Sequence, residues 1–332
     1  NKTYDGNTQV TFAYEGVVLE GNVDGDKLTV TAEGAFEDAN VGSKQVYITG
    51  LTLGGAEQGN YVLAERGQQT TATAAITAND RYLDLGGVDL GGDAGTVWID
   101  GEKQPINTSG GSHMLLPEEA EFLTTYTYSQ SGGGNGYPTG MKVYRFRRAD
   151  TGVTLEEIPE FENLLNYAGC SIRLTGTKGI RMITGISETK RTALIGAQGL
   201  AGYTLEEYGT VVMRGVGTPT LENSHSHNFA YKKGKADPVF GRAGGMVQYT
   251  NVLVGFSLED CKDTLTLRPY VLLKDTATGE TLTLYGGCVS RSIGYIAKQN
   301  ANTYQPGTAG YQYVHQIIDA VYGKTEQGGE TK

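Results

Sequence analysis

The sequence predicts a mainly β, multi-domain protein in which small all-β modules precede an α+β C-terminal module. Its 332 residues exceed one ordinary domain, because a single hydrophobic core rarely grows beyond roughly 250 to 300 residues. Its 49 glycines are about twice the ~7% of average usage, and they separate short alternating segments, as in turn-rich β structure. The 21 Tyr against 8 Phe suit partly solvated strands and also contacts to sugars or proteins.

Residues 1–78 are predicted to form a first, all-β domain. Apolar and polar residues alternate there in short runs, with turn residues such as Asn22 and Gly25 between them. Because the segment has its own strands and turns, we expect it to fold alone. The predicted strands are 9–14, 27–31, 45–48, 61–63 and 70–77.

The same residues contain an ordered set of short motifs. The motifs are KTYDGNT at 2–8, GD at 25–26, VG with Lys44 at 41–44, NYVL at 60–63 and TATAAI at 71–76. Together they resemble the YDG-type repeat of bacterial surface proteins. The resemblance implies a repeated stalk or spacer module on a secreted, wall-attached protein, and it implies no catalytic residues.

Residues 79–154 are a second, glycine-rich β region. Segments 122–128 and 141–146 are expected to be the arms of a hairpin around the loop 129–140, which contains the glycine-rich stretch 132–136. Because that loop lies between two strands, it does not predict a phosphate-binding loop. A helix is expected at 154–169, where the first turn is acidic and apolar residues recur on one face.

Residues 155–323 are predicted to form the α+β domain, and residues 324–332 a polar linker. The segments SIR at 171–173, KGIRMIT at 178–184, EYGT at 207–210, YKKG at 231–234, LRPY at 267–270 and RSI at 291–293 resemble an uncharacterised C-terminal module of large clostridial cell-surface proteins. This resemblance implies a location and no activity. The predicted strands are 170–175, 180–186, 211–214, 252–256, 264–273 and 281–285, and the predicted helices are 188–197, 290–298 and 309–322.

The net charge of −10 is unevenly distributed. Residues 1–78 carry 4 basic and 10 acidic side chains, residues 79–168 carry 6 and 14, and residues 169–332 carry 17 and 13. An acidic first half repels phosphates, so we expect no nucleic-acid partner, whereas the mildly basic last part suits an anionic ligand. No apolar run approaches the roughly 18 residues of a membrane helix. Any secretion signal or wall anchor is expected outside this segment.

The cysteines predict neither a zinc site nor a redox motif. Cys170, Cys261 and Cys288 have spacings that fit no such pattern, and we expect small core residues, with a Cys170–Cys288 disulfide as the alternative. Ser187 and Lys190 form an S-x-x-K pattern, which occurs in penicillin-interacting serine enzymes. The other motifs of those enzymes are incomplete, so Ser187 is expected to cap a helix with its hydroxyl.

No cofactor or metal is expected. His225 and His227 would share one face of a strand but lack a third ligand, so a polar turn before a strand is the main interpretation. Asp84, Asp89 and Asp93 lie among glycines, where a weak calcium site is the alternative to a plain linker. Their spacing does not fit a known calcium loop.

Several arginines lie inside otherwise apolar strands or at a helix start. A buried arginine needs carboxylate or carbonyl partners, because an unpaired buried charge is costly. The main interpretation is a structural network in which Arg181 pairs with Glu207, and the alternative is a pocket where two guanidinium groups bind a ligand carboxylate or sulfate. The candidate ligand-binding residues are Arg173, Arg181, Glu207, Arg268, Tyr270 and Arg291.

These observations favour a non-catalytic, adhesin-like extracellular protein attached to a cell wall or surface. Its β modules would display a Tyr-rich terminal module toward a glycan or a protein, and we expect a monomer. A purely architectural role in the envelope is the alternative. An extracellular hydrolase is a third hypothesis, which would require two carboxyl groups at a defined separation in a cleft.

Overall fold

The computed structural model describes residues 1–91, 95–108, 111–129, 136–235 and 239–324. Strands account for 47% of the residues and helices for 13%, which confirms the mainly β fold class. The predicted boundaries after residues 78, 154 and 323 stay predictions. The chain forms two units: unit 1 comprises Asn1–Val88, Pro105–Ala120 and Phe146–Leu155, and unit 2 comprises Asp89–Gln104, Glu121–Arg145 and Glu156–Lys332.

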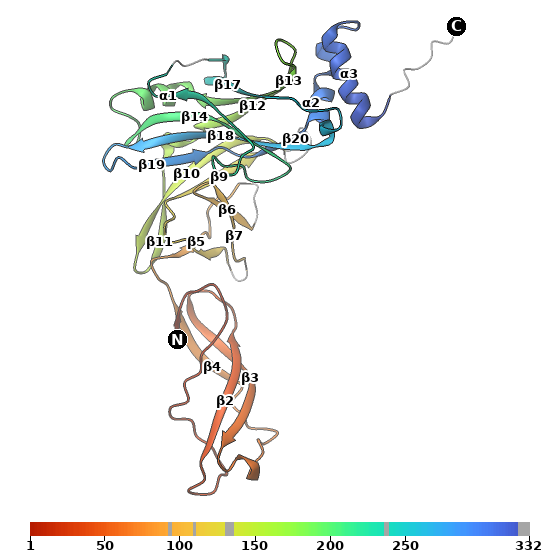
Figure 1. The fold of residues 1–332 in the computed structure, drawn as a ribbon. Coiled ribbons are helices and arrows are strands. Elements are labelled where there is room, and N and C mark those ends of the chain that lie inside the picture. Colours follow the sequence, from red (N-terminus) through yellow and green to blue (C-terminus); the bar gives the residue numbers. More distant parts are fainter. Residues whose placement is uncertain (92–94, 109–110, 130–135, 236–238, 325–332) are drawn as a thin grey trace. The chain divides into compact units, whose positions relative to one another are not determined.

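Unit 1 begins with a four-stranded sheet of order β1-β4-β3-β2 (Figure 1). The β2–β3 and β3–β4 pairs are antiparallel, whereas the short β1 runs parallel to β4, with Lys2 opposite Ile76. Tyr4, Phe36, Val46 and Ile76 form a small core. The strands are β1 Lys2–Thr3, β2 Leu28–Phe36, β3 Gly42–Gly55 and β4 Thr71–Thr77.

Three of the strands predicted in this sheet are confirmed as parts of β2, β3 and β4, and two are wrong. Segments 9–14 and 61–63 lie outside the named strands. The Tyr14 hydroxyl accepts a hydrogen bond from a backbone N–H of β2 (3.0 Å), and the Tyr61 hydroxyl donates to Asp26 (2.5 Å). Tyrosines that had suggested strands therefore tether loops.

Unit 1 also contains a buried histidine in its second group of strands, where β5 pairs antiparallel with β8 and parallel with β11. His113 is 2% exposed, and its ring lies 5.5 Å from that of Tyr4 and 6.1 Å from that of Tyr82. Its Nε2 has no hydrogen-bond partner among the described residues. Burial lowers the pKa of His113, although Asp84 and Asp38 oppose the shift. The strands are β5 Tyr82–Asp84, β8 His113–Leu115 and β11 Gly152–Glu157.

Unit 2 begins with a β-hairpin, β9–β10, and two shorter strands, β6 and β7, beside it. The β9–β10 pair is antiparallel, with Phe122 opposite Arg145, which confirms the predicted hairpin arms. Of the predicted loop 129–140, residues 130–135 lie outside the described residues, and the second arm begins earlier than predicted, at Pro138. β6 pairs with β9, and a turn with positive φ at Gly101 leads into β7. The strands are β6 Thr96–Ile99, β7 Glu102–Pro105, β9 Phe122–Tyr128 and β10 Pro138–Ala149.

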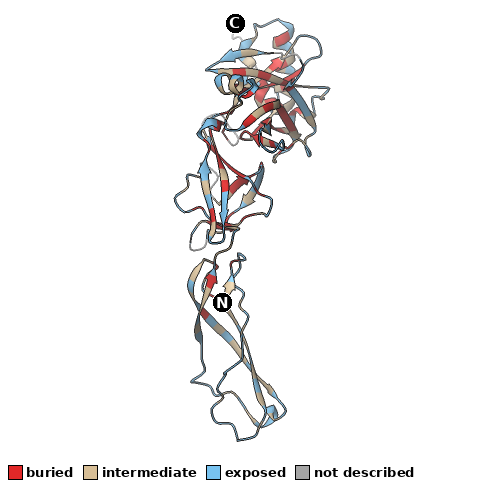
Figure 2. Cartoon of the chain, turned by 90° about the vertical axis from the view of Figure 1, so that its left-hand side faces the viewer, coloured by how far each residue is buried: buried red, intermediate tan, exposed pale blue. Residues whose placement is uncertain are grey.

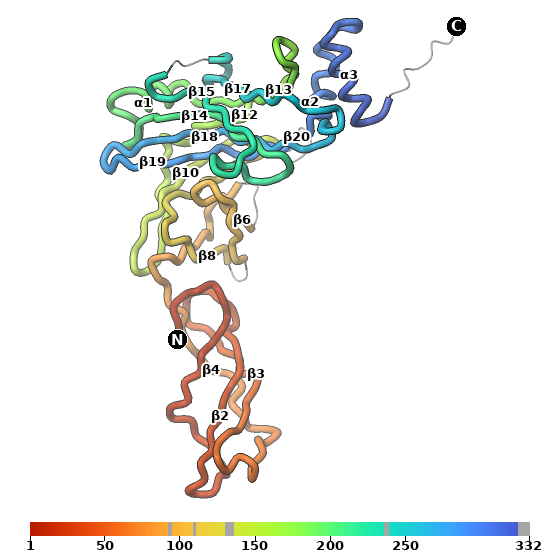
Figure 3. The backbone as a smooth tube through the Cα atoms, viewed as in Figure 1, coloured from red at the N-terminus to blue at the C-terminus, as the bar shows by residue number. Residues whose placement is uncertain are grey.

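The rest of unit 2 is a sandwich of two sheets, of orders β12-β13-β17-β16 and β15-β14-β18-β19, with β20 paired to β18. Figure 3 traces β18 and β19 in blue along one of them. Every strand predicted between residues 170 and 285 overlaps one of these strands. They are β12 Leu165–Arg173, β13 Gly179–Ser187, β14 Tyr203–Arg214, β15 Ser226–Lys232, β16 Gly241–Ala243, β17 Met246–Val254, β18 Thr264–Asp275, β19 Thr281–Tyr285 and β20 Val289–Ser292.

The core of unit 2 lies between these two sheets, where Figure 2 shows many buried positions in red. The rings of Tyr208 in β14 and Tyr249 in β17 lie 4.9 Å apart. The hydroxyls of Thr184 and Thr210 share a buried hydrogen bond of 2.7 Å between the same two sheets. Aromatic packing and one polar bridge therefore fix how the sheets face each other.

Among the residues that the structure describes, three α-helices occur, all of them late in the sequence. The predicted helices 188–197 and 309–322 are confirmed, whereas in 290–298 the first residues form β20 and the helix begins only at Ile293. The Thr308 hydroxyl caps α3 by accepting from the Tyr311 N–H. Within the described ranges, none of the helices has the length and apolar character needed to cross a membrane. The helices are α1 Glu188–Ile195, α2 Ile293–Gln299 and α3 Ala309–Tyr322, with short 3₁₀ turns at Gln58–Asn60, Pro159–Phe161, Asp260–Lys262 and Ala301–Thr303.

The helix predicted at 154–169 is wrong. β11 continues to Glu157, and a single 3₁₀ turn precedes β12. Pro159 disfavours helical backbone at the residue before it, and Asn163 has a positive φ of 51°, which ends any helical path. The apolar spacing instead delivers side chains singly into the core, namely Ile158, Phe161, Leu164 and Leu165.

Replacing His113 by Phe is expected to remove an acid-dependent loss of stability in unit 1. The folded-state pKa of His113 lies below its ordinary 6.5, so the unfolded chain binds the proton first as pH falls. The free energy of unfolding should decrease from about pH 6.5 down to the folded-state pKa and remain unaffected above that range. Circular dichroism melts at about pH 7.5 and 5.5 would measure this.

His315→Phe, in α3 of unit 2, is the matched control and should keep the acid sensitivity of unit 1. Fluorescence of Trp98, the single tryptophan, follows unit 2 separately. An equal acid-induced drop in His113→Phe and wild type would contradict the assignment to His113.

Candidate functional site

Arg268 in β18 is fully buried, and its hydrogen bonds go to neutral oxygens. Its Nε donates to the Gly286 carbonyl (2.7 Å) and its Nη1 to the Gly101 carbonyl (2.6 Å). Its Nη2 donates to the Tyr126 hydroxyl (3.3 Å). The guanidinium carbon lies 4.7 Å from the Trp98 ring and 4.5 Å from the Tyr285 ring. Arg268 therefore has a structural role: it is closed to solvent and has the carbonyl partners that a buried arginine requires.

Arg291 in β20 is held in a similar way. Its Nη1 donates to the Ser290 carbonyl and its Nη2 to the Gly136 carbonyl, both at 2.7 Å. Arg173 is half-buried at the end of β12, where its guanidinium lies over the turn at Gly176. Arg268, Arg291 and Arg173 therefore have different partners and share no common ligand-binding contact in the structure.

The predicted ion pair between Arg181 and Glu207 is wrong. The alternation in β13 is as expected, because Ile180 and Met182 are fully buried while Arg181 is half-buried. The Arg181 guanidinium lies over the Phe240 ring, 4.9 Å from its centroid. Since β13 and β14 belong to different sheets, strand alternation alone could not bring Glu207 to this face.

A β-bulge in β14 turns Glu207 toward Tyr270. Leu205 lies opposite Leu273 but Glu207 lies opposite Leu272, so Glu206 is an extra residue. The bulge reverses the alternation and puts Glu207 on the sheet face opposite to the core. The Tyr270 hydroxyl donates to Glu207 Oε1 at 2.5 Å, so the structure brings these two predicted residues together.

His227 and Lys232 of β15 complete this group, which we name the Glu207 cluster: Glu207, His227, Lys232 and Tyr270. Lys232 Nζ lies 3.0 Å from Glu207 Oε2. His227 Nε2 lies 2.5 Å from the Tyr270 oxygen, and it is the donor because the tyrosine proton points to Glu207. Burial alone would raise the pKa of Glu207, but hydrogen bonds from Tyr270 and Lys232 lower it below its ordinary value. The pKa of Tyr270 is raised by burial and by its bond to Glu207.

Phe229 presents an exposed ring beside the Glu207 cluster. It is 42% exposed, and Lys232 Nζ and Lys235 Nζ lie 5.8 and 5.3 Å from its ring centroid. Gly209 lies opposite, where a Cβ would come within 2.8 Å of Phe229 Cα and 2.9 Å of Tyr270 Cε1. Glycine therefore lets Phe229 and Tyr270 lie close together, and the edge of β15 offers an aromatic ring flanked by two ammonium groups.

Sequence reasoning found Glu207 and Tyr270 but missed Phe229, His227 and Lys232 as neighbours. His227 was assigned to a turn, whereas β15 begins at Ser226 and includes it. The available signal was an exposed aromatic between a histidine and a lysine in one alternating segment. The pairing of that segment with β14 could not be read from its spacing.

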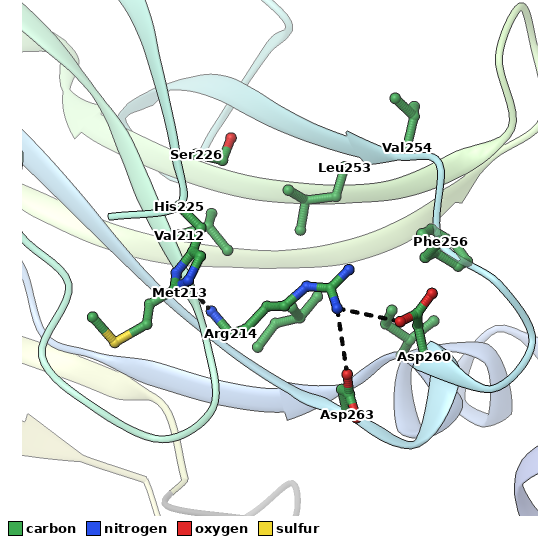
Figure 4. Close-up of a pocket in the computed structure, with 12 residues that line it drawn as sticks. Val212, Met213, Arg214, His225, Ser226, Leu253, Val254, Phe256, Asp260 and Asp263 are labelled. Carbon is green, nitrogen blue, oxygen red and sulfur yellow. Dashed lines mark hydrogen bonds and ion pairs between the residues drawn. The ribbon is translucent and has the colours of Figure 1, made fainter. Parts of the chain in front are cut away.

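A separate pocket of about 170 Å³ lies at the end of β14 (Figure 4). Its apolar lining includes Val212 and Leu253, and its polar side includes Arg214. Arg214 Nη1 lies 3.2 Å from Asp260 Oδ1 and 3.7 Å from Asp263 Oδ2. The pocket therefore combines a hydrophobic interior with a charged rim.

The other candidate groups serve local structure. None of the three cysteines forms a disulfide in the structure, so the disulfide alternative is wrong. Ser187 stands at the helix N-cap position, but its hydroxyl makes no capping bond and lies 3.4 Å from the Thr189 hydroxyl, which corrects the predicted cap. Lys190 donates to the backbone carbonyl of Glu162, away from Ser187.

No three His, Cys, Asp or Glu side chains in the described part of the chain gather where they could hold a metal. Asp84 and Asp89 each accept from a backbone N–H two residues on, at 2.8 and 3.0 Å, as in Asx turns. Asp93 lies outside the described residues. His225 accepts a weak bond from a backbone N–H at 3.4 Å, whereas His227 contacts Tyr270, so the two histidines have different partners.

Replacing Arg268 by Met is expected to lower the free energy of unfolding of unit 2 by about 3 to 5 kcal/mol, because two buried carbonyl oxygens lose their donor. Gly101→Ala should cost about 1 to 3 kcal/mol, since Gly101 has a φ of 88° and an added Cβ would meet Tyr285 at 2.5 Å. Urea unfolding followed by Trp98 fluorescence measures both effects. Arg214→Met, at an exposed ion pair, is the control and should cost less than about 1 kcal/mol. An unchanged midpoint for Arg268→Met would refute the structural role.

Replacing Glu207 by Gln should cost about 1 to 2 kcal/mol, because a charge-assisted pair of hydrogen bonds is weakened. The folded-state pKa of Glu207 lies below its ordinary 4.5. Its contribution is therefore complete above that pH and is lost as pH falls through the folded value, so variant and wild type should converge in acid. Glu206→Gln, at the adjacent and more exposed pair with Lys233, is the control with a smaller effect. A difference that persists unchanged in acid would argue against an ionised Glu207.

Comparison with known protein families identifies one segment of the chain. Residues 1–73 match the YDG domain family, and no curated protein matches the chain. A DUF3823 family protein from Bacteroides ovatus is similar at 12% identity and a TM-score of 0.26, over 61% of this chain and 91% of that protein. Residues 1–73 of this chain are therefore a YDG domain.

Proposed function

We propose that this chain is a non-catalytic display protein of a bacterial cell surface, in which unit 2 binds an anionic glycan or an acidic protein. The YDG domain would act as a spacer, consistent with its resemblance to repeats of bacterial surface proteins. The resemblance of residues 155–323 to a module of clostridial surface proteins supports the same location. A monomeric protein fits the proposal.

The observation that carries the proposal is the exposed Phe229 ring between Lys232 and Lys235, beside the Glu207 cluster. An aromatic face gives apolar contact area, and ammonium groups select negative charge. Lys232 is already paired with Glu207, so Lys235 is the better placed of the two to meet a ligand. The basic excess of residues 169–332 supports an anionic partner.

At the Glu207 cluster, a binding role is favoured over hydrolysis by the state of its carboxyl group. A glycosidase keeps one carboxyl group protonated as a general acid. At Glu207 the net effect of its partners lowers the pKa, and at Asp260 hydrogen bonds from Ser257 lower it as well. Neither Glu207 nor Asp260 is therefore suited to act as a general acid, which supports a binding role at these two places.

The test is a glycan array probed with the full chain, comparing sialylated, sulfated and neutral glycans. We expect binding to acidic glycans, a loss of at least about tenfold in affinity for Lys235→Glu, and a similar loss for Phe229→Ser.

Lys298→Glu is the matched control, because Lys298 also lies near an aromatic ring, 5.2 Å from that of Tyr322, on a different part of unit 2. It should leave binding unchanged. Binding that is indifferent to Lys235 and Phe229 would remove this site from the proposal. If the chain bound neither the glycans on the array nor acidic proteins, the result would favour a purely architectural role.

A further inference from the structure

The pocket at the end of β14 has a well-packed apolar floor. Val212, Leu265 and Ile293 line it and are 2%, 6% and 3% exposed. These residues belong to the hydrophobic core that includes α2 and α3. Because core side chains beneath it are close-packed, the pocket keeps its form without a ligand.

The rim of this pocket carries an excess of negative charge. Figure 4 shows the Arg214 side chain reaching toward both Asp260 and Asp263. Asp260 is held in place by the N–H and hydroxyl of Ser257, at 2.6 and 2.8 Å, which lower its pKa. Two carboxylates facing one guanidinium leave a net charge that attracts a cation.

Apolar side chains continue from the pocket onto the surface. Val254, which lines the pocket, is 49% exposed, and Leu258, two residues before Asp260, is 48% exposed. Exposed apolar surface beside a pocket is typical of an interaction site. A ligand confined to the pocket would leave this surface in water, whereas a protein would cover it.

The size and chemistry of the pocket restrict what it accepts. Its volume of about 170 Å³ is below the roughly 300 to 1,000 Å³ of small-molecule sites, and it suits a single aliphatic side chain. A sugar ring fits poorly, because its hydroxyls would find no partners on the apolar floor. Protein interfaces commonly place one anchor side chain in such a pocket and exclude water around it.

We infer that this pocket binds a protein partner that inserts one branched aliphatic side chain followed directly by Lys or Arg. The aliphatic group fills the space above Val212 and Ile293, and the basic group meets the carboxylate of Asp263. This inference goes beyond the proposed function, since it concerns different residues and the opposite ligand charge.

The test is a methyl NMR titration of the full chain with two blocked tetrapeptides, acetyl-Gly-Leu-Lys-Gly-amide and acetyl-Gly-Leu-Glu-Gly-amide, up to about 10 mM. We expect saturable shifts of the Val212, Leu253 and Ile293 methyl groups with the lysine peptide. The glutamate peptide should bind at least about fivefold more weakly, because its charge opposes that of the rim.

Asp263→Asn should bring the two affinities together, and Glu280→Gln, at an exposed carboxylate between β18 and β19, should preserve their difference. Equal affinities in the wild type, or no shift of these methyl groups, would overturn the inference. Phe229→Ser should leave the titration unchanged, so this outcome is independent of the proposed anionic-ligand site.

Discussion

The buried guanidinium of Arg268 is the interaction on which unit 2 depends most. A cation taken out of water must have its donors satisfied, and here two backbone carbonyls and the Tyr126 hydroxyl accept them, while two aromatic rings lie against the guanidinium. One carbonyl belongs to Gly101, which is far from Arg268 in sequence, so the charge fixes the β6–β7 turn against β18. The single tryptophan of the chain, Trp98, is used at this place.

The same requirement sets constraints on neighbouring residues. Gly101 has a positive φ, and the space where its side chain would lie is filled by Tyr285. A Cβ at Gly286 would meet the Pro269 ring at 2.6 Å. In the sequence these glycines look like ordinary turn residues. In the structure, close packing around the Arg268 side chain leaves no room for a Cβ at either position.

The sequence allowed much of unit 2 to be predicted where the signal is local. Local sequence pattern located the β9–β10 arms, β19 and α3, whereas the Thr308 cap of α3 was seen only in the structure. The helix at 154–169 failed because Pro159 and Asn163 interrupt an apolar spacing that serves the core in another way. Glu207 and Tyr270 were found as candidates, but their contact depends on the bulge at Glu206. Bulges and strand partners are set by long-range pairing, and the spacing within one segment does not encode them.

The parallel pairing of β1 with β4 has a mechanical consequence. The first and last strands of the YDG sheet run side by side in the same direction, and the Tyr4 N–H donates to the Thr77 carbonyl at 2.8 Å where they end. Tension drawn across residues 1–77 would pull these strands past each other along their axes. Their hydrogen bonds would then carry the force together and resist shear, instead of opening one at a time as in a peeled hairpin. The longer β2–β3 hairpin would be shielded from the force until that small clamp yielded.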